Sequence, residues 1–385
     1  MKPATLAVHA GAPEGANAPV TTPIVQSTTF RFESAAAVER YARGEGGLYM
    51  YSRDENPTVR AAETAIAALE GAESCVLFGS GMGAMSAAVM ALVSGGEEVV
   101  AATALYGGTY KLLRDVLSRF GVKSRMAEPE ALVDACAKGG SRLCVFESPT
   151  NPTLRVLDMA AVARACRSSG TLSLIDSTFA PSLVQRPLEA GVDLVMHSAT
   201  KFLNGHSDHL CGVIAGRREL VEKVRLIARK LGSVLDPQVA YDLLRGLKTF
   251  AVRVERQSAT AAALARWLES QRAVARVWYP GLPSHPDHEL ARRQMNGFGG
   301  MVCFSVGSRE KAFRFWDRLQ LIARAASLGG PETLTSLPIL FSHTGYSPEE
   351  LRRAGVDEGM VRMSVGLEDP EDLIADLRQA LQSVA

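Results

Sequence analysis

The chain has 385 residues, of which 47% are hydrophobic and 22% charged, and its 42 Lys and Arg residues against 41 Asp and Glu residues leave a net charge of +1. This is the composition of a globular protein that can bury a large core without disulfides or metals, and the length predicts two or three domains. The even charge balance argues against disorder and against general binding of nucleic acid, which usually needs a basic face.

Residues 1–55 differ from the rest of the chain. Pro3, Pro13, Pro19 and Pro23, together with several glycines, disfavour a long helix there. A segment this irregular usually packs on something else, so we predict that it is an arm contacting a neighbouring subunit.

Residues 56–245 contain short apolar runs that alternate with helical patterns. The predicted strands are 74–78, 98–102, 143–147, 172–176 and 194–198, and the predicted helices are 57–69, 84–92, 108–120 and 158–168. Apolar strands between helices indicate a mostly parallel sheet that is covered by helices on both faces, so the predicted fold class is α/β.

Residues 246–385 predict a smaller C-terminal α/β domain. A long helical stretch from about residue 237 to 270 leads into it, with Gly246 as a kink point. Strands are expected at 274–279, 300–306 and 360–365 among further helices.

Glycine-rich or polar segments follow several of these strands, and in an open parallel sheet ligands bind beyond the carboxyl ends of the strands. Residues 79–83 (Gly-Ser-Gly-Met-Gly) join a strand to a helix, where backbone amides favour an anion. The same residues also suit a plain tight turn, and they match neither the P-loop nor the GxGxxG pattern. Phosphate binding and a structural turn are therefore equal alternatives for this segment.

Asp176 closes one predicted strand, and Lys201 follows the next strand in the segment Ser198-Ala199-Thr200-Lys201. A buried carboxylate needs a cationic partner such as a protonated ring nitrogen, and a lysine beside hydroxyls is a candidate for a Schiff base. Taken alone, the aspartate is explained as a turn former and the lysine as a surface residue. Their position on neighbouring strands is a more specific signal than either residue.

Four more positions complete the candidate site. Tyr106, before two glycines, can stack on an aromatic ligand, and Asn151, in a loop held by two prolines, can hydrogen-bond one. Arg53 lies between the arm and the core. Arg362 lies inside an apolar strand, where it needs either a substrate carboxylate or an internal ion pair.

Neither a metal site nor a membrane segment is expected. His206 and His209 lack a metal-ligand spacing, and the six cysteines are scattered without a CxxC pair, as buried thiols of a reducing compartment would be. No run of about 18 apolar residues and no N-terminal signal peptide is visible. We expect a cytoplasmic protein that binds neither membrane nor nucleic acid.

Taken together, these segments resemble the cysteine/methionine metabolism family of pyridoxal-phosphate (PLP) enzymes. This family includes cystathionine γ-lyase, cystathionine γ-synthase, methionine γ-lyase and the O-acylhomoserine sulfhydrylases. The matching segments are 8–11, 23–30, 51–53, 56–58, 80–82, 106–109, 149–152, 176–179, 198–208, 245–249, 279–286, 327–330 and 362–368. The resemblance implies the type I PLP-dependent transferase fold and a homotetramer, built as a dimer of dimers with shared active sites.

The resemblance also implies roles toward the cofactor pyridoxal 5'-phosphate. Lys201 would form the Schiff base, Asp176 would pair with the pyridinium nitrogen, and Tyr106 would stack on the ring and exchange protons with the substrate. The residues implied to hold the phosphate are Gly81, Met82, Ser198 and Thr200.

By the same resemblance, Tyr51 and Arg53 of the arm would reach the phosphate of the cofactor in the neighbouring subunit. Asn151, Ser327 and Arg362 would bind the substrate, with Arg362 holding its carboxylate.

The subgroup within the family is less distinct. Ala326 stands where cystathionine γ-lyases and γ-synthases commonly carry a glutamate, which favours a less polar pocket. Gly108 stands where methionine γ-lyases commonly carry a cysteine, and the pair Asp54-Glu55 is unusual for the family. We expect a carbon–sulfur γ-lyase that converts methionine or cystathionine to 2-oxobutanoate, ammonia and a thiol. The alternative is γ-replacement, as in a cystathionine γ-synthase or O-acylhomoserine sulfhydrylase.

Overall fold

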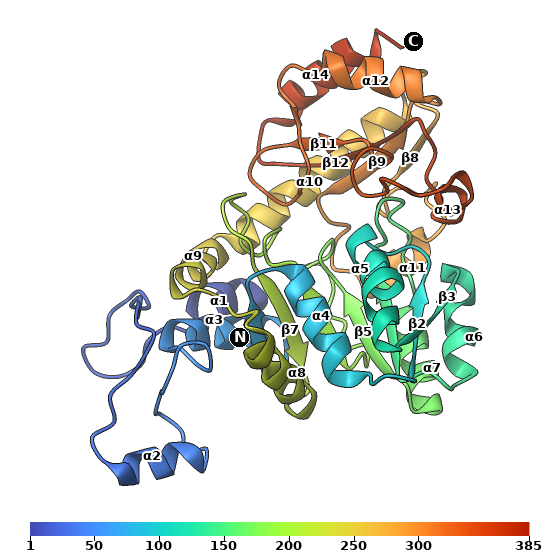
Figure 1. Ribbon diagram of the computed structural model, residues 1–385. Coiled ribbons are helices and arrows are strands. Elements are labelled where there is room, and N and C mark those ends of the chain that lie inside the picture. The colour runs from blue at the N-terminus through green and yellow to red at the C-terminus, as the bar shows by residue number, and fades with distance from the viewer. Residues whose placement is uncertain (385) are drawn as a thin grey trace.

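The computed structural model describes residues 1–384, so Ala385, the last residue of the predicted C-terminal domain, lies outside the described residues. It contains a seven-stranded and a five-stranded sheet, each packed against helices, and an arm that projects from the body beside the larger sheet (Figure 1). Within residues 1–384, no helix combines the length and the apolar character that crossing a membrane requires.

The larger sheet has the strand order β1-β7-β6-β5-β4-β2-β3. Its strands are β1 (Ser74–Phe78), β2 (Glu98–Ala102), β3 (Lys123–Ala127), β4 (Leu143–Glu147), β5 (Leu172–Asp176), β6 (Leu194–His197) and β7 (Gly212–Gly216). Strand β7 runs antiparallel to β1 and β6, and the other neighbouring strands are parallel. The predicted α/β class and mostly parallel sheet are therefore confirmed.

Strands β3 and β7 do not follow the apolar pattern by which the other five strands were predicted. Strand β3 lies at the edge of the sheet and begins with exposed Lys123 and Ser124, so it lacks a continuous apolar run. Strand β7 is fully buried but begins and ends with glycine, a residue that usually weakens strands. In both cases the position in the sheet, and not local propensity, forms the strand.

The helices around this sheet are α3 (Pro57–Glu70), α4 (Gly81–Leu92), α5 (Gly107–Lys111), α6 (Leu132–Ala137), α7 (Met159–Ser169) and α8 (Arg218–Leu231). Helix α3 shows why the boundary signals work. The Asn56 side chain accepts a hydrogen bond from the Thr58 amide, Pro57 occupies the first turn, and Gly71 ends the helix at a φ of 67°. The helix predicted over 108–120 is an α-helix only in its first part, because it continues as a π-helical and then a 3-10 segment.

Both faces of the larger sheet are buried. In β1, Val76 and Phe78 belong to one hydrophobic cluster, while Cys75 and Leu77 belong to another on the opposite face. The second cluster extends to Met301 at the start of β9 in the smaller sheet, so the two sheets share a core. This alternation explains why the predicted strands show continuous apolar runs.

The smaller sheet has the order β10-β11-β12-β9-β8. Its strands are β8 (Arg276–Trp278), β9 (Met301–Ser305), β10 (Ala323–Arg324), β11 (Leu334–Ser336) and β12 (Met360–Ser364). The helices of this half are α9 (Pro237–Leu247), α10 (Phe250–Glu269), α11 (His288–Gln294), α12 (Arg309–Arg318), α13 (Pro348–Arg353) and α14 (Pro370–Leu381). The long predicted helix is divided into α9 and α10, and the break lies after Leu247, just beyond the predicted kink point at Gly246. A Cβ at Gly246 would lie 2.3 Å from the Asn204 carbonyl oxygen, so close packing requires this glycine.

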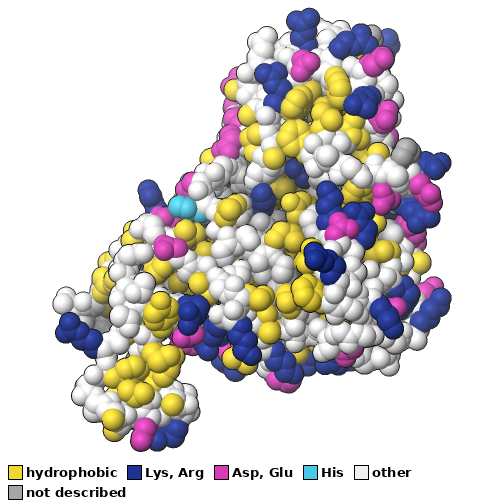
Figure 2. Space-filling model, in the orientation of Figure 1, with side chains coloured by type: hydrophobic (Ala, Val, Ile, Leu, Met, Phe, Trp, Pro, Cys, Tyr) yellow, Lys and Arg dark blue, Asp and Glu magenta, His cyan; other side chains and the backbone are white. Residues whose placement is uncertain are grey.

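The arm contains only two short helices, α1 (Pro3–His9) and α2 (Ala35–Ala42). Helix α1 packs on α3 and α10, whereas α2 lies far from the body at the end of the projection (Figure 1). Hydrophobic side chains gather on the projection (Figure 2), and Val20 of the arm is 92% exposed. A surface of this kind is typical of a segment that packs on another molecule.

Candidate active site

Lys201 lies in the loop after β6, at the carboxyl end of the larger sheet. Its Nζ donates a hydrogen bond to Ser327 Oγ at 2.7 Å, although Ser327 is 126 residues away, between β10 and β11 of the smaller sheet. Burial and the nearby charge of Arg362 lower the pKa of Lys201 to about 8. Near neutral pH this amine is therefore closer to its neutral, nucleophilic form than an exposed lysine.

Asp176 and Glu147 end neighbouring parallel strands and lie directly opposite each other in the register of β4 and β5. Burial raises the pKa of both carboxyl groups, and the charge of Asp176 raises that of Glu147 further. Asp176 Oδ1 accepts hydrogen bonds from the Thr178 amide at 3.0 Å and hydroxyl at 2.5 Å. Among the described residues Asp176 has no ion-pair partner, so it fits the protonated nitrogen of a bound ring.

The start of α4 packs against the loop that carries Lys201. Ser80 caps the helix by accepting a hydrogen bond from the Gly83 amide at 3.0 Å. A Cβ added to Gly81 would lie 3.0 Å from Ser198 Oγ, so the helix start and Ser198 are in direct contact. Thr200 is fixed nearby, because its hydroxyl accepts a hydrogen bond from the Cys211 amide at 2.9 Å. The glycines, hydroxyls and amides of this corner fit a bound phosphate.

Tyr106 lies at the N-terminus of α5 with 45% of its surface exposed. Its backbone amide donates to the buried Glu147 carboxyl group, which fixes the tyrosine beside Asp176. A Cβ at Gly108 would lie 2.5 Å from the Tyr106 ring and 2.9 Å from Met82 Sδ. With the tyrosine in this position, a larger residue at 108 would have to displace the ring.

Arg362, on β12, is buried and its guanidinium points toward the same site. It donates to Asn151 Oδ1 at 3.2 Å and to the Ser327 carbonyl oxygen at 3.3 Å, and it lies 5.9 Å from the Phe179 ring centre. Within the described part of the chain it forms no ion pair with a carboxylate, so the alternative of an internal ion pair is wrong. An unneutralised buried guanidinium beside a lysine suits a substrate carboxylate.

Ser327 connects the two cations, because its hydroxyl contacts Lys201 and its carbonyl contacts Arg362. Its φ of 86° lies in the left-handed region, which is strained for serine. Strain of this kind concentrates where a side chain must be held in a functional position.

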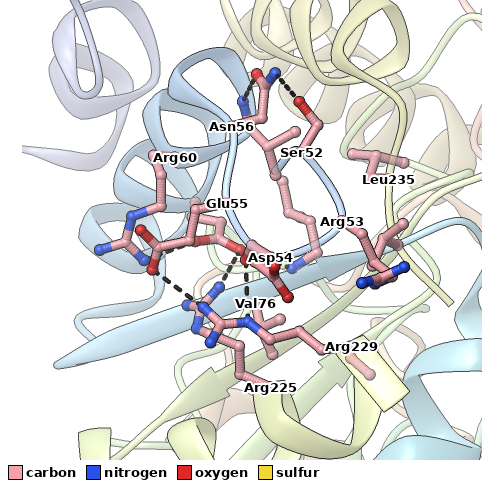
Figure 3. A pocket seen from close by; sticks show the side chains of 15 residues that line it. Ser52, Arg53, Asp54, Glu55, Asn56, Arg60, Val76, Arg225, Arg229 and Leu235 are labelled. Carbon is pink, nitrogen blue, oxygen red and sulfur yellow. Dashed lines mark hydrogen bonds and ion pairs between the residues drawn. The ribbon is translucent and has the colours of Figure 1, made fainter. Parts of the chain in front are cut away.

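Tyr51 and Arg53 are not brought to this site. They lie on the arm, where the Arg53 guanidinium stacks 5.0 Å from the Tyr51 ring centre. Arg229 of α8 anchors the loop by donating to the Asp54 carbonyl at 3.1 Å and to Glu55 Oε1 at 3.2 Å. Figure 3 shows these contacts around a cavity of about 30 Å³, with the Arg53 guanidinium apart from the cluster of Glu55 and Arg229.

Two functional candidates were not identified from the sequence. Glu147 was noted only as a strand end, and Phe179 only as part of a motif, yet both contact residues of the site. Glu147 could have been found by the same signal as Asp176, because it is an acidic residue that closes an apolar strand.

The sequence predicted no metal site, and the structure bears differently on the histidines and on the cysteines. His206 contacts the Asn204 carbonyl and His209 contacts Asp242, so the two histidines have separate partners. The cysteines are not all scattered in space, because Cys136, Cys144 and Cys166 form a group of possible metal ligands.

Comparisons with known proteins match this chain over nearly its whole length to enzymes of one family. A family model described as Cys/Met metabolism PLP-dependent enzyme matches residues 4–382. The L-methionine gamma-lyase of Fusobacterium nucleatum is 41% identical, over 99% of this chain and 98% of that protein. The O-succinylhomoserine sulfhydrylase of Pseudomonas aeruginosa is also 41% identical, over 99% and 95%. The structure of cystathionine gamma-lyase from Lactobacillus plantarum complexed with L-serine superposes with a TM-score of 0.93 at 35% identity, covering 100% of this chain and 99% of that one.

Proposed function

The chain belongs to the Cys/Met metabolism family of PLP-dependent enzymes, and we propose that within this family it is a carbon–sulfur γ-lyase acting on methionine or cystathionine. The reaction releases 2-oxobutanoate, ammonia and a thiol. The observation that carries the proposal is the convergence of Lys201 and Arg362 on Ser327, which sets an amine of lowered pKa beside a carboxylate-binding cation. Methionine γ-lyases at about 40% identity support this choice of reaction.

The cofactor is pyridoxal 5'-phosphate, which supplies an electron sink for the substrate carbon skeleton when it is bound. Lys201 is the residue to which it would be linked. Asp176 would hold the ring nitrogen in its protonated form. The groups that would bind the phosphate are Gly81, Met82, Ser198 and Thr200.

The substrate is oriented by its carboxylate, which Arg362 would hold, while Asn151 Oδ1 accepts a hydrogen bond from the same guanidinium at 3.2 Å. Lys201 Nζ then takes a proton from the substrate Cα. The hydrogen bond between Nζ and the Ser327 hydroxyl keeps the amine in position for this step. The Tyr106 hydroxyl takes a proton from the substrate ammonium group and gives one to the leaving sulfur. The Glu147 carboxyl group keeps Tyr106 in place by accepting a hydrogen bond from the Tyr106 backbone amide.

Ala326, next to Ser327, supports an apolar side chain as the substrate group, because no carboxylate or amide is present at that position. The methyl thioether of methionine is such a group. Gly108 packs against the Tyr106 ring, so the tyrosine keeps this position only with a residue as small as glycine at 108.

γ-Replacement is the second candidate function. A sulfhydrylase at 41% identity and the Arabidopsis thaliana protein named Cystathionine gamma-synthase 1, chloroplastic, at 40% identity favour it. Such an enzyme would consume an O-acylhomoserine only when a thiol nucleophile is supplied.

We place the enzyme in the cytoplasm as a homotetramer made of two tight dimers. The exposed hydrophobic side chains of the arm and the position of Tyr51 and Arg53 away from Lys201 support subunit contacts through the arm. The six cysteines are free and buried, which suits a reducing compartment.

A substrate panel tests the proposal. The purified holoenzyme is incubated with methionine, cystathionine, O-acetylhomoserine and O-succinylhomoserine, each with and without an added thiol. The expected result is release of 2-oxobutanoate from methionine or cystathionine without thiol. Turnover of an O-acylhomoserine that depends on thiol, with no 2-oxo acid from any sulfur amino acid, would show replacement instead.

A further inference from the structure

Three buried cysteines meet in the core on one face of the larger sheet. Cys136 comes from α6, Cys144 from β4 and Cys166 from α7, and their sulfur atoms all lie within 4.8 Å of one another. Cys136 is 1% exposed and the other two are completely buried. We refer to these three residues as the thiol triad.

The polar surroundings of the triad carry no spare positive charge. The charge of Arg125 acts on Cys136, but this arginine already donates to Glu98 Oε1 at 2.9 Å and to the Ser141 hydroxyl at 2.9 Å. The triad belongs to a hydrophobic core cluster that also includes Val99 and Leu143, and among the described residues the only other charge acting on it is the negative charge of Asp193 near Cys166. An ion bound to three thiolates therefore has to neutralise all their charge itself, because an uncompensated buried charge is costly.

The ligand atoms that the triad offers are three sulfur atoms. Soft thiolate ligands select thiophilic ions over hard ones. The described residues offer the triad no histidine, aspartate or glutamate as a fourth donor.

From this geometry we propose that the thiol triad is a binding site for trivalent arsenic. Arsenous acid reacts with three thiols to form three As–S bonds and three molecules of water, As(OH)₃ + 3 RSH → As(SR)₃ + 3 H₂O. No electrons are transferred, and the product is neutral. A zinc ion on three thiolates would leave one negative charge and lack its fourth ligand, and a cuprous ion would leave two negative charges.

Access to the buried site requires local opening. Helix α6 has only six residues, and it covers the triad next to α7. Short elements of this kind open without unfolding of the whole domain. The ligand can therefore enter without loss of the sheet.

The test uses the reduced holoenzyme incubated with sodium arsenite and then dialysed. Intact-protein mass spectrometry should show a mass increase of one arsenic atom minus three hydrogen atoms. X-ray absorption at the arsenic edge should show three sulfur neighbours and no oxygen neighbour. Absence of bound arsenic, or arsenic with oxygen ligands, would overturn the proposal.

Variants locate the site. Cys136→Ala and Cys166→Ala should lose the arsenic on dialysis, whereas the matched control Cys303→Ala, a buried cysteine of β9, should retain it. Arsenic retained by both triad variants would contradict the assignment. If a variant does not fold, the absorption measurement on the wild-type protein still decides between three sulfur ligands and any other coordination.

Discussion

At the scale of single residues, the site is organised around Ser327, which holds Lys201 through its hydroxyl and Arg362 through its carbonyl. The two cations are kept close although their charges repel, and burial prevents water from screening them. The consequence is an amine whose pKa is lowered to about 8, with burial as the larger cause and Arg362 as the second.

The pH dependence of cofactor capture should report this pKa. The protonated amine cannot attack an aldehyde, so the rate at which the apoenzyme takes up PLP should rise with pH through a midpoint of about 8 and then level off. In Arg362→Gln the loss of the neighbouring charge should move the midpoint to higher pH, because a cation nearby disfavours the protonated lysine. Stopped-flow absorbance of the bound cofactor measures both profiles. An unchanged midpoint in the variant would remove Arg362 as a cause.

Lys201→Ala should abolish covalent attachment of the cofactor and reduce the rate of 2-oxobutanoate release by at least about 10²–10⁴-fold, the range by which a positioned acid–base group contributes. Lys123→Ala, at an exposed lysine of the edge strand β3, is the control and should keep both properties. Reduction with borohydride followed by peptide mapping detects the attachment. Turnover that survives in Lys201→Ala would rule out the proposed mechanism.

At the scale of elements, the carboxyl ends of the parallel strands and the start of α4 supply the site. Strand β4 ends at Glu147, β5 ends at Asp176, and the loop with Lys201 follows β6. Because these neighbouring strands are parallel, the three segments meet at the same edge of the larger sheet. Helix α4 begins at this edge, so its unpaired amides and its dipole favour a phosphate there.

The cap of α4 offers a prediction with an internal control. Ser80→Ala and Ser308→Ala each remove a serine that caps a helix, α4 in the site and α12 outside it. Each should lower the free energy of unfolding by about 1 kcal/mol, since caps are worth roughly 0.5–2 kcal/mol. Only Ser80→Ala should also weaken PLP binding, because only that cap orders amides at the phosphate corner. Urea denaturation of the apoenzymes and PLP titration measure the two effects, and equal PLP affinity in both variants would contradict the assignment.

At the scale of the whole molecule, the arm separates Tyr51 and Arg53 from the site formed by the rest of the chain. Arg229 and Glu55 hold the loop in which Arg53 is presented, so the arginine is ordered without any carboxylate partner among the described residues. An ordered cation on a projecting hydrophobic arm suits the active site of a second copy of the chain.

Mixing inactive subunits tests this arrangement. Arg53→Ala and Lys201→Ala subunits should each have low activity, and co-expression should restore activity well above that of either parent. In a mixed dimer one site has an intact Arg53 from one subunit and an intact Lys201 from the other. Purification with two different tags isolates the mixed species for assay. If the mixed species is no more active than the parents, each chain completes its own site.

Much of the site followed from the sequence because the chemistry needs particular residue types at strand ends. Lys201, Asp176 and Tyr106 each follow or close an apolar strand, and that local pattern depends only on neighbouring residues. The α/β class followed for the same reason, since strand and helix periods are local. Strands β3 and β7 could not be predicted in this way, because their neighbours in the sheet, and not their own residues, decide their conformation.

The sequence by itself therefore determined the family, the fold class and the residue types of the candidate site. The tertiary structure alone decided which distant residues meet. The contact of Arg362 with Asn151 spans 211 residues, and three cysteines on separate elements converge in one core. Local periodicity carries no information on such pairs, because they depend on how elements pack after long loops have closed.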